Sequence, residues 1–146
     1  MTPNGQTLNV TTITSDLHQY GGWESKKVVD LFVIFARTCY ELFGVRVKDW
    51  ITFNEPMVIP EGGYLYKFHY PLKVDGKAAV QIIYNINLAS AKGVQAYHEY
   101  CEQEGIKDGR IGIVINLTPA YPRSESPEDV AAAHFAEIFK NNAFLD

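Results

Sequence analysis

Apolar residues recur at three- and four-residue spacing in three long stretches of the chain, a pattern that predicts amphipathic helices. The stretches cover residues 25–43, 77–104 and about 127–141. Gly44 and Gly105 follow the first two stretches and are natural C-terminal stops.

Runs of β-branched and aromatic residues predict strands over residues 7–14, 45–53 and 110–117. The last run is almost continuously apolar, as expected of a parallel strand that is covered on both faces. Strands and helices therefore alternate along the chain, which is the βαβ pattern of a parallel sheet with right-handed crossovers. The sequence predicts an α/β fold with about three parallel strands and three main helices.

The stretch Trp-Ile-Thr-Phe-Asn-Glu-Pro at residues 50–56 carries the candidate chemistry. Pro56 has no N–H to donate and restricts Glu55 to extended geometry, so Asn54 and Glu55 are predicted at the C-terminal tip of a strand. In α/β folds that tip is where ligands bind and catalysis occurs. A lone glutamate at a strand end nevertheless more often only caps a loop.

A long loop is predicted over residues 57–76, and loops of this length in a compact domain are uncommon and often functional. It contains five residues with aromatic rings, namely Tyr64, Tyr66, Phe68, His69 and Tyr70. These side chains either line a ligand cleft or cover the end of the sheet, and the pattern favours neither alternative.

Composition and charge narrow the possible functions. The net charge is −4 and the basic residues are scattered, which argues against a nucleic-acid partner. No apolar run approaches the about 18 residues of a membrane span, and the N-terminus lacks signal-peptide features, so a cytoplasmic chain without a membrane partner is expected. Cys39 and Cys101 fall on predicted helices and are expected to be reduced. The histidines, among them His69, His98 and His134, do not have the paired spacing of metal ligands. No metal or other cofactor is therefore expected.

Four stretches together resemble one known family. Residues 50–56 match the W-x-T-F-N-E-P signature of family 1 glycoside hydrolases, the retaining β-glucosidases, β-galactosidases and their 6-phospho relatives. Residues 20–23 (Tyr-Gly-Gly-Trp), 110–122 and 142–146 resemble the flanking motifs in the same order. The resemblance covers residues 19–146, whereas residues 1–18 depart from the family pattern. It implies a partial (β/α)8 TIM barrel, about its third to fifth βα units.

The resemblance also implies roles for individual residues. Glu55 is similar to the general acid/base of the family, and Asn54 matches the amide that hydrogen-bonds the sugar 2-hydroxyl. Asn116 is expected to line the aglycone side, or to bond the local backbone as strand-end asparagines do. The implied substrate is a β-glycoside or a 6-phospho-β-glycoside, and the Glu-Gly-Gly-Tyr sequence at residues 61–64 looks most like the 6-phospho enzymes.

One expected feature of the family is absent from the sequence. Retaining hydrolysis needs a second carboxylate as nucleophile, and the chain has no T/I-E-N-G motif to supply it. The chain is therefore expected to be a glycosidase fragment that is inactive alone. The alternatives are a fragment that self-associates into a homo-oligomer through exposed sheet edges or faces, or a weak sugar-binding α/β module.

Overall fold

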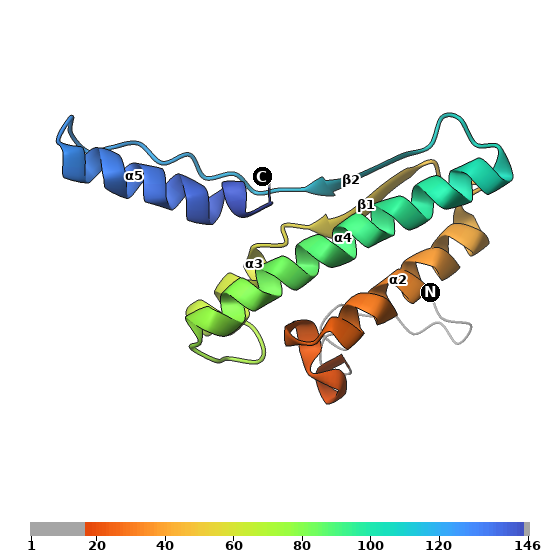
Figure 1. Ribbon diagram of the computed structural model, residues 1–146, viewed down its shortest axis with the longest axis horizontal. Helices are drawn as coiled ribbons and strands as arrows, with labels where there is room; N and C mark the ends of the chain where they lie inside the picture. Colours follow the sequence, from red (N-terminus) through yellow and green to blue (C-terminus); the bar gives the residue numbers. More distant parts are fainter. Residues whose placement is uncertain (1–16, 145–146) are drawn as a thin grey trace.

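The computed structural model describes residues 17–144, which form an α/β layer (Figure 1). The helices and strands in chain order are α2 (Lys26–Phe43), β1 (Asp49–Asn54), α3 (Val58–Pro60), α4 (Gly76–Glu104), β2 (Arg110–Val114) and α5 (Pro127–Lys140). Short turns of other helix types complete the list: His18–Tyr20, Gly22–Glu24, Glu61–Leu65 and Asn142–Phe144. The three predicted helices are thus confirmed as α2, α4 and α5.

The helix ends show why these segments fold locally. The Oγ of Ser25 accepts a hydrogen bond from the Lys27 N–H (3.2 Å), and Asp75 caps α4 by accepting from the Ala78 N–H (3.0 Å). Gly105 ends α4 in the left-handed region with φ 67°, as predicted. Gly44 follows α2 but is right-handed, so it does not form a left-handed cap; glycine is needed there for packing, because a Cβ would clash with the Tyr100 ring.

β1 and β2 pair in parallel, as the alternating pattern predicts. The predicted strand over residues 7–14 lies outside the described residues. β1 begins at Asp49, later than predicted, because the preceding residues form a turn in which the N–H groups of Arg46 and Val47 both donate to the Phe43 carbonyl (2.9 and 2.8 Å).

The prediction that the strand over residues 110–117 is covered on both faces is wrong for the described part of the chain. Ile111 and Ile113 are half-buried on the helix side, whereas Gly112 and Val114 on the other side are exposed. Figure 1 shows why: α4 and α2 lie on one side of the strands. β2 also ends early, at Val114, because β1 stops at Asn54 and leaves the following residues without a neighbouring strand in the described chain.

α4 is the central element of the core. One cluster of buried side chains joins it to α2 and comprises Ala36, Tyr40, Ala96, Tyr97 and Tyr100. A second cluster joins it to the turn after β1 and comprises Tyr64, Ala78, Ala79, Ile82 and Ile86. The two clusters fix α4 along nearly its whole length against β1 and α2.

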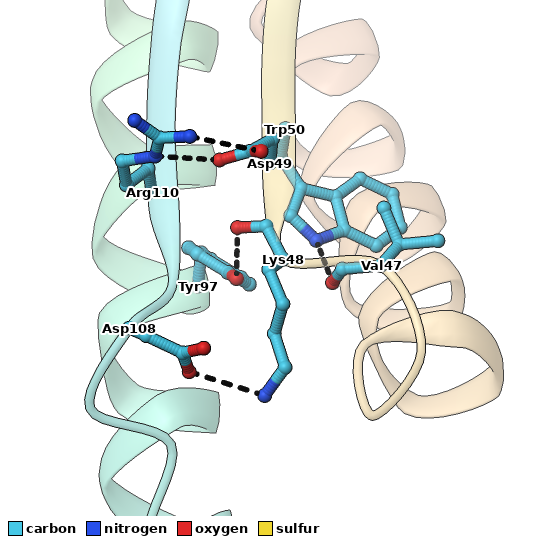
Figure 2. Close-up of polar contacts among 7 residues, drawn as sticks. All are labelled: Val47, Lys48, Asp49, Trp50, Tyr97, Asp108 and Arg110. Carbon is cyan, nitrogen blue, oxygen red and sulfur yellow. Dashed lines mark hydrogen bonds and ion pairs between the residues drawn. The ribbon is translucent and has the colours of Figure 1, made fainter.

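Polar contacts fix the start of the sheet (Figure 2). The Tyr97 hydroxyl on α4 donates to the Lys48 carbonyl (3.0 Å), immediately before β1. Arg110 pairs with Asp49 through two contacts of 2.7 and 3.1 Å across the two strands. Because such exposed ion pairs add little stability, their main consequence is to favour this register.

The segment over residues 57–76 is not the irregular loop that the sequence predicts. α3 and a π-helical turn (Glu61–Leu65) occupy its first half. The glycines of this segment permit close packing, since a Cβ on Gly62 would lie 2.5 Å from the His69 ring. Tyr64 is buried in the core, whereas Tyr66, Phe68 and Tyr70 are exposed.

Candidate active site

A β-bulge interrupts β1 just before its end. Ile51 pairs with Gly112 and Asn54 pairs with Val114, so three residue steps on β1 oppose two steps on β2. A bulge of this kind changes which face of the sheet the following side chains occupy.

The two residues inside the bulge both face the helices. Thr52 Oγ1 lies 2.7 Å from Ser90 Oγ on α4. The Phe53 ring stacks on Phe32 of α2, with 4.7 Å between centroids, and meets Trp23 edge-on at 5.4 Å. Regular alternation would place only one of these two side chains on the helix side.

The bulge brings Asn54 to the face that the helices leave open. Asn54 is exposed on the same side as Ile51, which is 59% exposed. Glu55 follows directly and is half-buried, and its N–H donates to the Val114 carbonyl (2.8 Å), which extends the ladder by one bond. The predicted pair of Asn54 and Glu55 therefore lies at the C-terminal tip of β1.

The prediction of extended geometry for Glu55 is wrong, because its φ is 47°, in the left-handed region. The chain turns at once into α3, and the Val58 N–H donates to the Glu55 carbonyl (3.0 Å). Left-handed backbone at a residue other than glycine costs on the order of 1–3 kcal/mol and is concentrated at functional sites. Two hydrogen bonds stabilise this conformation: the Glu55 N–H donates to the Val114 carbonyl, and the Glu55 carbonyl accepts from the Val58 N–H.

Asn116 lies two residues after the end of β2 and is exposed. Because the two strands are parallel, it is at the same end of the sheet as Asn54 and Glu55. The structure thus brings the three predicted site residues to one end of the sheet, with Asn116 on the segment that leaves it.

Residues that sequence reasoning missed hold this segment. Asn141, at the end of α5, accepts a hydrogen bond from the Thr118 N–H (3.0 Å) and donates to the Thr118 carbonyl (3.2 Å). The Glu137 carboxylate accepts from the Ala120 N–H (2.7 Å), and this bond, together with Asn141, lowers the pKa of Glu137. The only available signal was a polar residue at the end of an apolar helix face, which is too common to be informative.

The carboxylates near the turn after Glu55 are already paired. Glu61 forms an ion pair with Lys140 of α5. Lys73 Nζ lies 2.6 Å from Glu24 and 5.6 Å from the centre of the Tyr64 ring. Burial, followed by the nearby Glu24 charge, raises the pKa of Tyr64 well above its usual range. These contacts tie the segment after Glu55 to α5 and to Glu24, and Glu55 is the carboxylate at the strand tip.

Comparison with known proteins places the chain in a family. Residues 7–146 match the family model described as Glycosyl hydrolase family 1. The chain belongs to this family. It is 53% identical over 130 residues to the 6-phospho-beta-glucosidase GmuD of Bacillus subtilis (strain 168), and 41% identical over 121 residues to a 1,4-beta-D-glucan glucohydrolase of Thermotoga neapolitana. These matches cover 89% and 83% of this chain but only 27% of each relative, so the chain spans about a quarter of their length.

Solved family 1 structures show the same fold. A beta-glucosidase from Thermotoga maritima in complex with deoxynojirimycin superposes with a TM-score of 0.77 at 39% identity, covering 85% of this chain and 27% of that one. A beta-glucosidase from Exiguobacterium marinum gives a TM-score of 0.78 at 34% identity and covers 88% and 28%. The family 1 chain is therefore a partial (β/α)8 barrel, of which β1 and β2 are neighbouring strands. The boundary at residues 18 and 19 stays a prediction.

The described residues of this family 1 chain contain neither a metal-binding cluster nor a membrane-spanning helix. Over residues 17–144, no group of three or more His, Cys, Asp or Glu side chains is arranged to hold a metal ion. In the same part of the chain, no helix has the length and apolarity needed to cross a membrane.

Proposed function

We propose that Glu55 is the general acid/base of a retaining β-glycosidase and that Asn54 binds the sugar beside it. The observation that carries this proposal is the bulged tip of β1, which presents an amide on the open face of the sheet next to a half-buried carboxylate. In a barrel enzyme this end of the strands holds the substrate. We propose that Asn116, at the same end, contacts the aglycone.

The chemistry assigns two successive tasks to Glu55. Its carboxylic acid donates a proton to the glycosidic oxygen as the bond to the sugar breaks, and its carboxylate then removes a proton from the water that releases the sugar. Between these steps a second carboxylate must form a covalent bond to the sugar, about 5–5.5 Å from the first. The sequence has no T/I-E-N-G motif for that role, so we expect no normal turnover from the 146-residue chain alone.

The proposed substrate is a β-glucoside, in particular a 6-phospho-β-glucoside. The support is the 53% identity to the 6-phospho-beta-glucosidase GmuD and the 36% identity to the aryl-phospho-beta-D-glucosidase BglC of Bacillus subtilis (strain 168). The Glu61–Leu65 turn, which contains the Glu-Gly-Gly-Tyr sequence, begins six residues after Glu55, and the Glu61 N–H donates to the Met57 carbonyl (3.1 Å).

The test uses nitrophenyl β-glucosides and their 6-phosphates with two proteins. The first is the chain itself, for which we expect no release of nitrophenol. The second is a chimera in which this chain replaces the matching segment of GmuD, for which we expect activity that falls at least about 1,000-fold in Glu55→Gln. Full activity of the Glu55→Gln chimera would refute the role of Glu55.

A second, non-catalytic function is favoured by the exposed apolar side chains of the chain. Ile51 and Val114 lie on the open face of the sheet, and Phe135 of α5 is 70% exposed. We propose that copies of the chain self-associate through these surfaces when no further barrel units cover them, because such patches drive association.

Light scattering tests self-association. We expect oligomers of the chain, and a shift toward the monomer when Ile51→Lys and Phe135→Lys are combined. Tyr121→Lys serves as the control for added charge, because Tyr121 is also exposed. A monodisperse monomer of the unchanged chain would contradict the proposal.

We also propose a cytosolic location. Cys39 and Cys101 are both free thiols, which a reducing compartment preserves. A weak sugar-binding module remains the third alternative, and titration with β-glucosides tests it through chemical-shift changes at Asn54.

A further inference from the structure

We propose that Thr52 is a positioning residue for Glu55, because its hydroxyl holds the β-bulge that aims Asn54 and Glu55 into the site. This inference rests on the proposed role of Glu55. Thr52 itself faces the helices, away from the substrate side of the sheet, so it acts through the backbone.

The hydrogen bonds of Thr52 have one consistent arrangement. Its Oγ1 lies 2.7 Å from Ser90 Oγ and 3.2 Å from the Gly112 carbonyl oxygen. A carbonyl can only accept, and a hydroxyl has a single proton. Thr52 therefore donates to Gly112, and Ser90 donates to Thr52. One side chain thus ties β1 to both β2 and α4.

These bonds lie at the point where the register changes. Gly112 is the partner of Ile51, the last residue of β1 before the bulge, and Asn54 resumes pairing after it. Thr52 is the first residue inside the bulge. Its hydroxyl therefore bonds to the residue opposite Ile51, at the point where the regular register ends.

The surface of α4 is shaped to receive this side chain. Ser90 and Gly93 are three residues apart on α4 and share one face. A Cβ on Gly93 would lie 3.6 Å from Thr52 Cγ2 and 3.2 Å from the Phe32 ring. The Thr52 methyl group therefore packs against the helix backbone at Gly93, and its hydroxyl hydrogen-bonds to Ser90.

Without the bulge, strict alternation would exchange the two faces. Phe53 would move to the open side and Asn54 would turn toward the helices. The Phe53 contacts with Phe32 and Trp23 oppose this slip from the apolar side. The hydrogen bonds of Thr52 to Ser90 and Gly112 also oppose it. Together these contacts place the Asn54 amide on the substrate side.

Amide hydrogen exchange of the full chain tests this proposal without requiring turnover. The Glu55 N–H donates to Val114 at the bulged end of the sheet, and the Arg110 N–H donates to Lys48 at the other end (2.7 Å). In Thr52→Val, which keeps the shape and removes the hydroxyl, we expect Glu55 to exchange at least about tenfold faster. The exchange rate of the Arg110 amide should change by less than about twofold, and the Glu55 amide in Thr52→Ser should be as protected as in the unchanged chain.

Other outcomes overturn the proposal. Unchanged exchange at Glu55, equal loss of protection at Glu55 and Arg110, or failure of Thr52→Ser to restore protection would each show that the hydroxyl does not hold the bulge. Ser90→Ala carries the test if Thr52→Val does not fold, since alanine is favourable in a helix. Faster exchange at Glu55 but not at Arg110 in Ser90→Ala supports the proposal, and unchanged exchange refutes it. A Glu55→Gln chimera that retains full activity would refute only the proposed function.

Discussion

α4 and α5 are both amphipathic helices of this α/β chain, yet they are held in different ways. α4 buries ten residues, among them Ile82, Ile86 and Tyr97, against the strands, α2 and the turn after β1. α5 has no buried residue, and Phe135 on its apolar side is 70% exposed. In Figure 1, α5 extends away from the packed layer, and its end returns toward the strands.

Polar contacts near its C-terminal end tie α5 to the rest of the chain. Asn141 and Glu137 bind the segment after β2, and Lys140 pairs with Glu61 in the turn after β1. The comparison shows that helical periodicity predicts a helix but not its burial, which depends on what lies opposite. Hydrophobic packing fixes α4, whereas a few directional hydrogen bonds fix α5.

The largest expected effect comes from truncating a side chain in the packed region. Ile86 is fully buried on α4, so Ile86→Ala should lower the free energy of unfolding by about 2–5 kcal/mol. At a chain concentration low enough to keep the chain monomeric, Phe135→Ala on α5 should alter this free energy by less than about 0.5 kcal/mol. Chemical denaturation monitored by circular dichroism measures both, and equal losses would remove the contrast between the helices.

A smaller effect is expected from Asn141→Ala, which removes both hydrogen bonds to Thr118 at a position that is 5% exposed. Losing these two partly buried hydrogen bonds should cost about 1–3 kcal/mol, and the loss should be local to α5 and the segment after β2. Hydrogen exchange should accelerate at the Thr118 amide and stay unchanged at Ile86. Asn142→Ala is the control, and similar acceleration in both variants would contradict the role of Asn141.

The smallest expected effect is a pH dependence at the same contact. Hydrogen bonds from Ala120 and Asn141 lower the pKa of Glu137 in the folded chain, so the unfolded chain takes up the proton first. The stabilisation is therefore complete above the ordinary glutamate pKa of about 4.3 and is lost as the pH falls through the lowered value. Protection of the Ala120 amide, corrected for intrinsic exchange, should fall between about pH 5 and 3 while that of Ile86 persists. In Glu137→Gln this dependence should vanish; its persistence would assign it to another group.

Much of the fold was predictable from local signals. Ser25 and Gly105 mark helix ends that the structure confirms, since capping depends only on neighbouring residues. The one-sided cover of β2 and the exposure of α5 were not predictable, because they depend on elements distant in sequence. The helical turn after Glu55 was also missed, because the segment has no helical periodicity, and the role of Gly62 and Gly63, which let the Phe68–Tyr70 region pack closely, depends on contacts that only the fold creates.

The site was predictable in position but not in detail. Pro56 and the signature around it place Asn54 and Glu55 at a strand tip. The bulge and the left-handed backbone of Glu55 were not predictable, because they depend on how β1 pairs with β2 and on the contact of Thr52 with Ser90. Nothing in the sequence of β1 distinguishes a regular strand from one that carries an extra residue.

The most direct test of the central claim is azide rescue of Glu55→Ala in the GmuD chimera, with dinitrophenyl β-glucoside 6-phosphate as substrate. This leaving group departs without a proton, so the covalent intermediate still forms, but water then lacks a base. Azide is a nucleophile that needs no base. We expect it to raise the turnover number at least about tenfold and to yield the β-glycosyl azide, with the configuration of the substrate retained. A rate that azide leaves unchanged, or an α-glycosyl azide as product, would contradict the assignment of Glu55 as the acid/base.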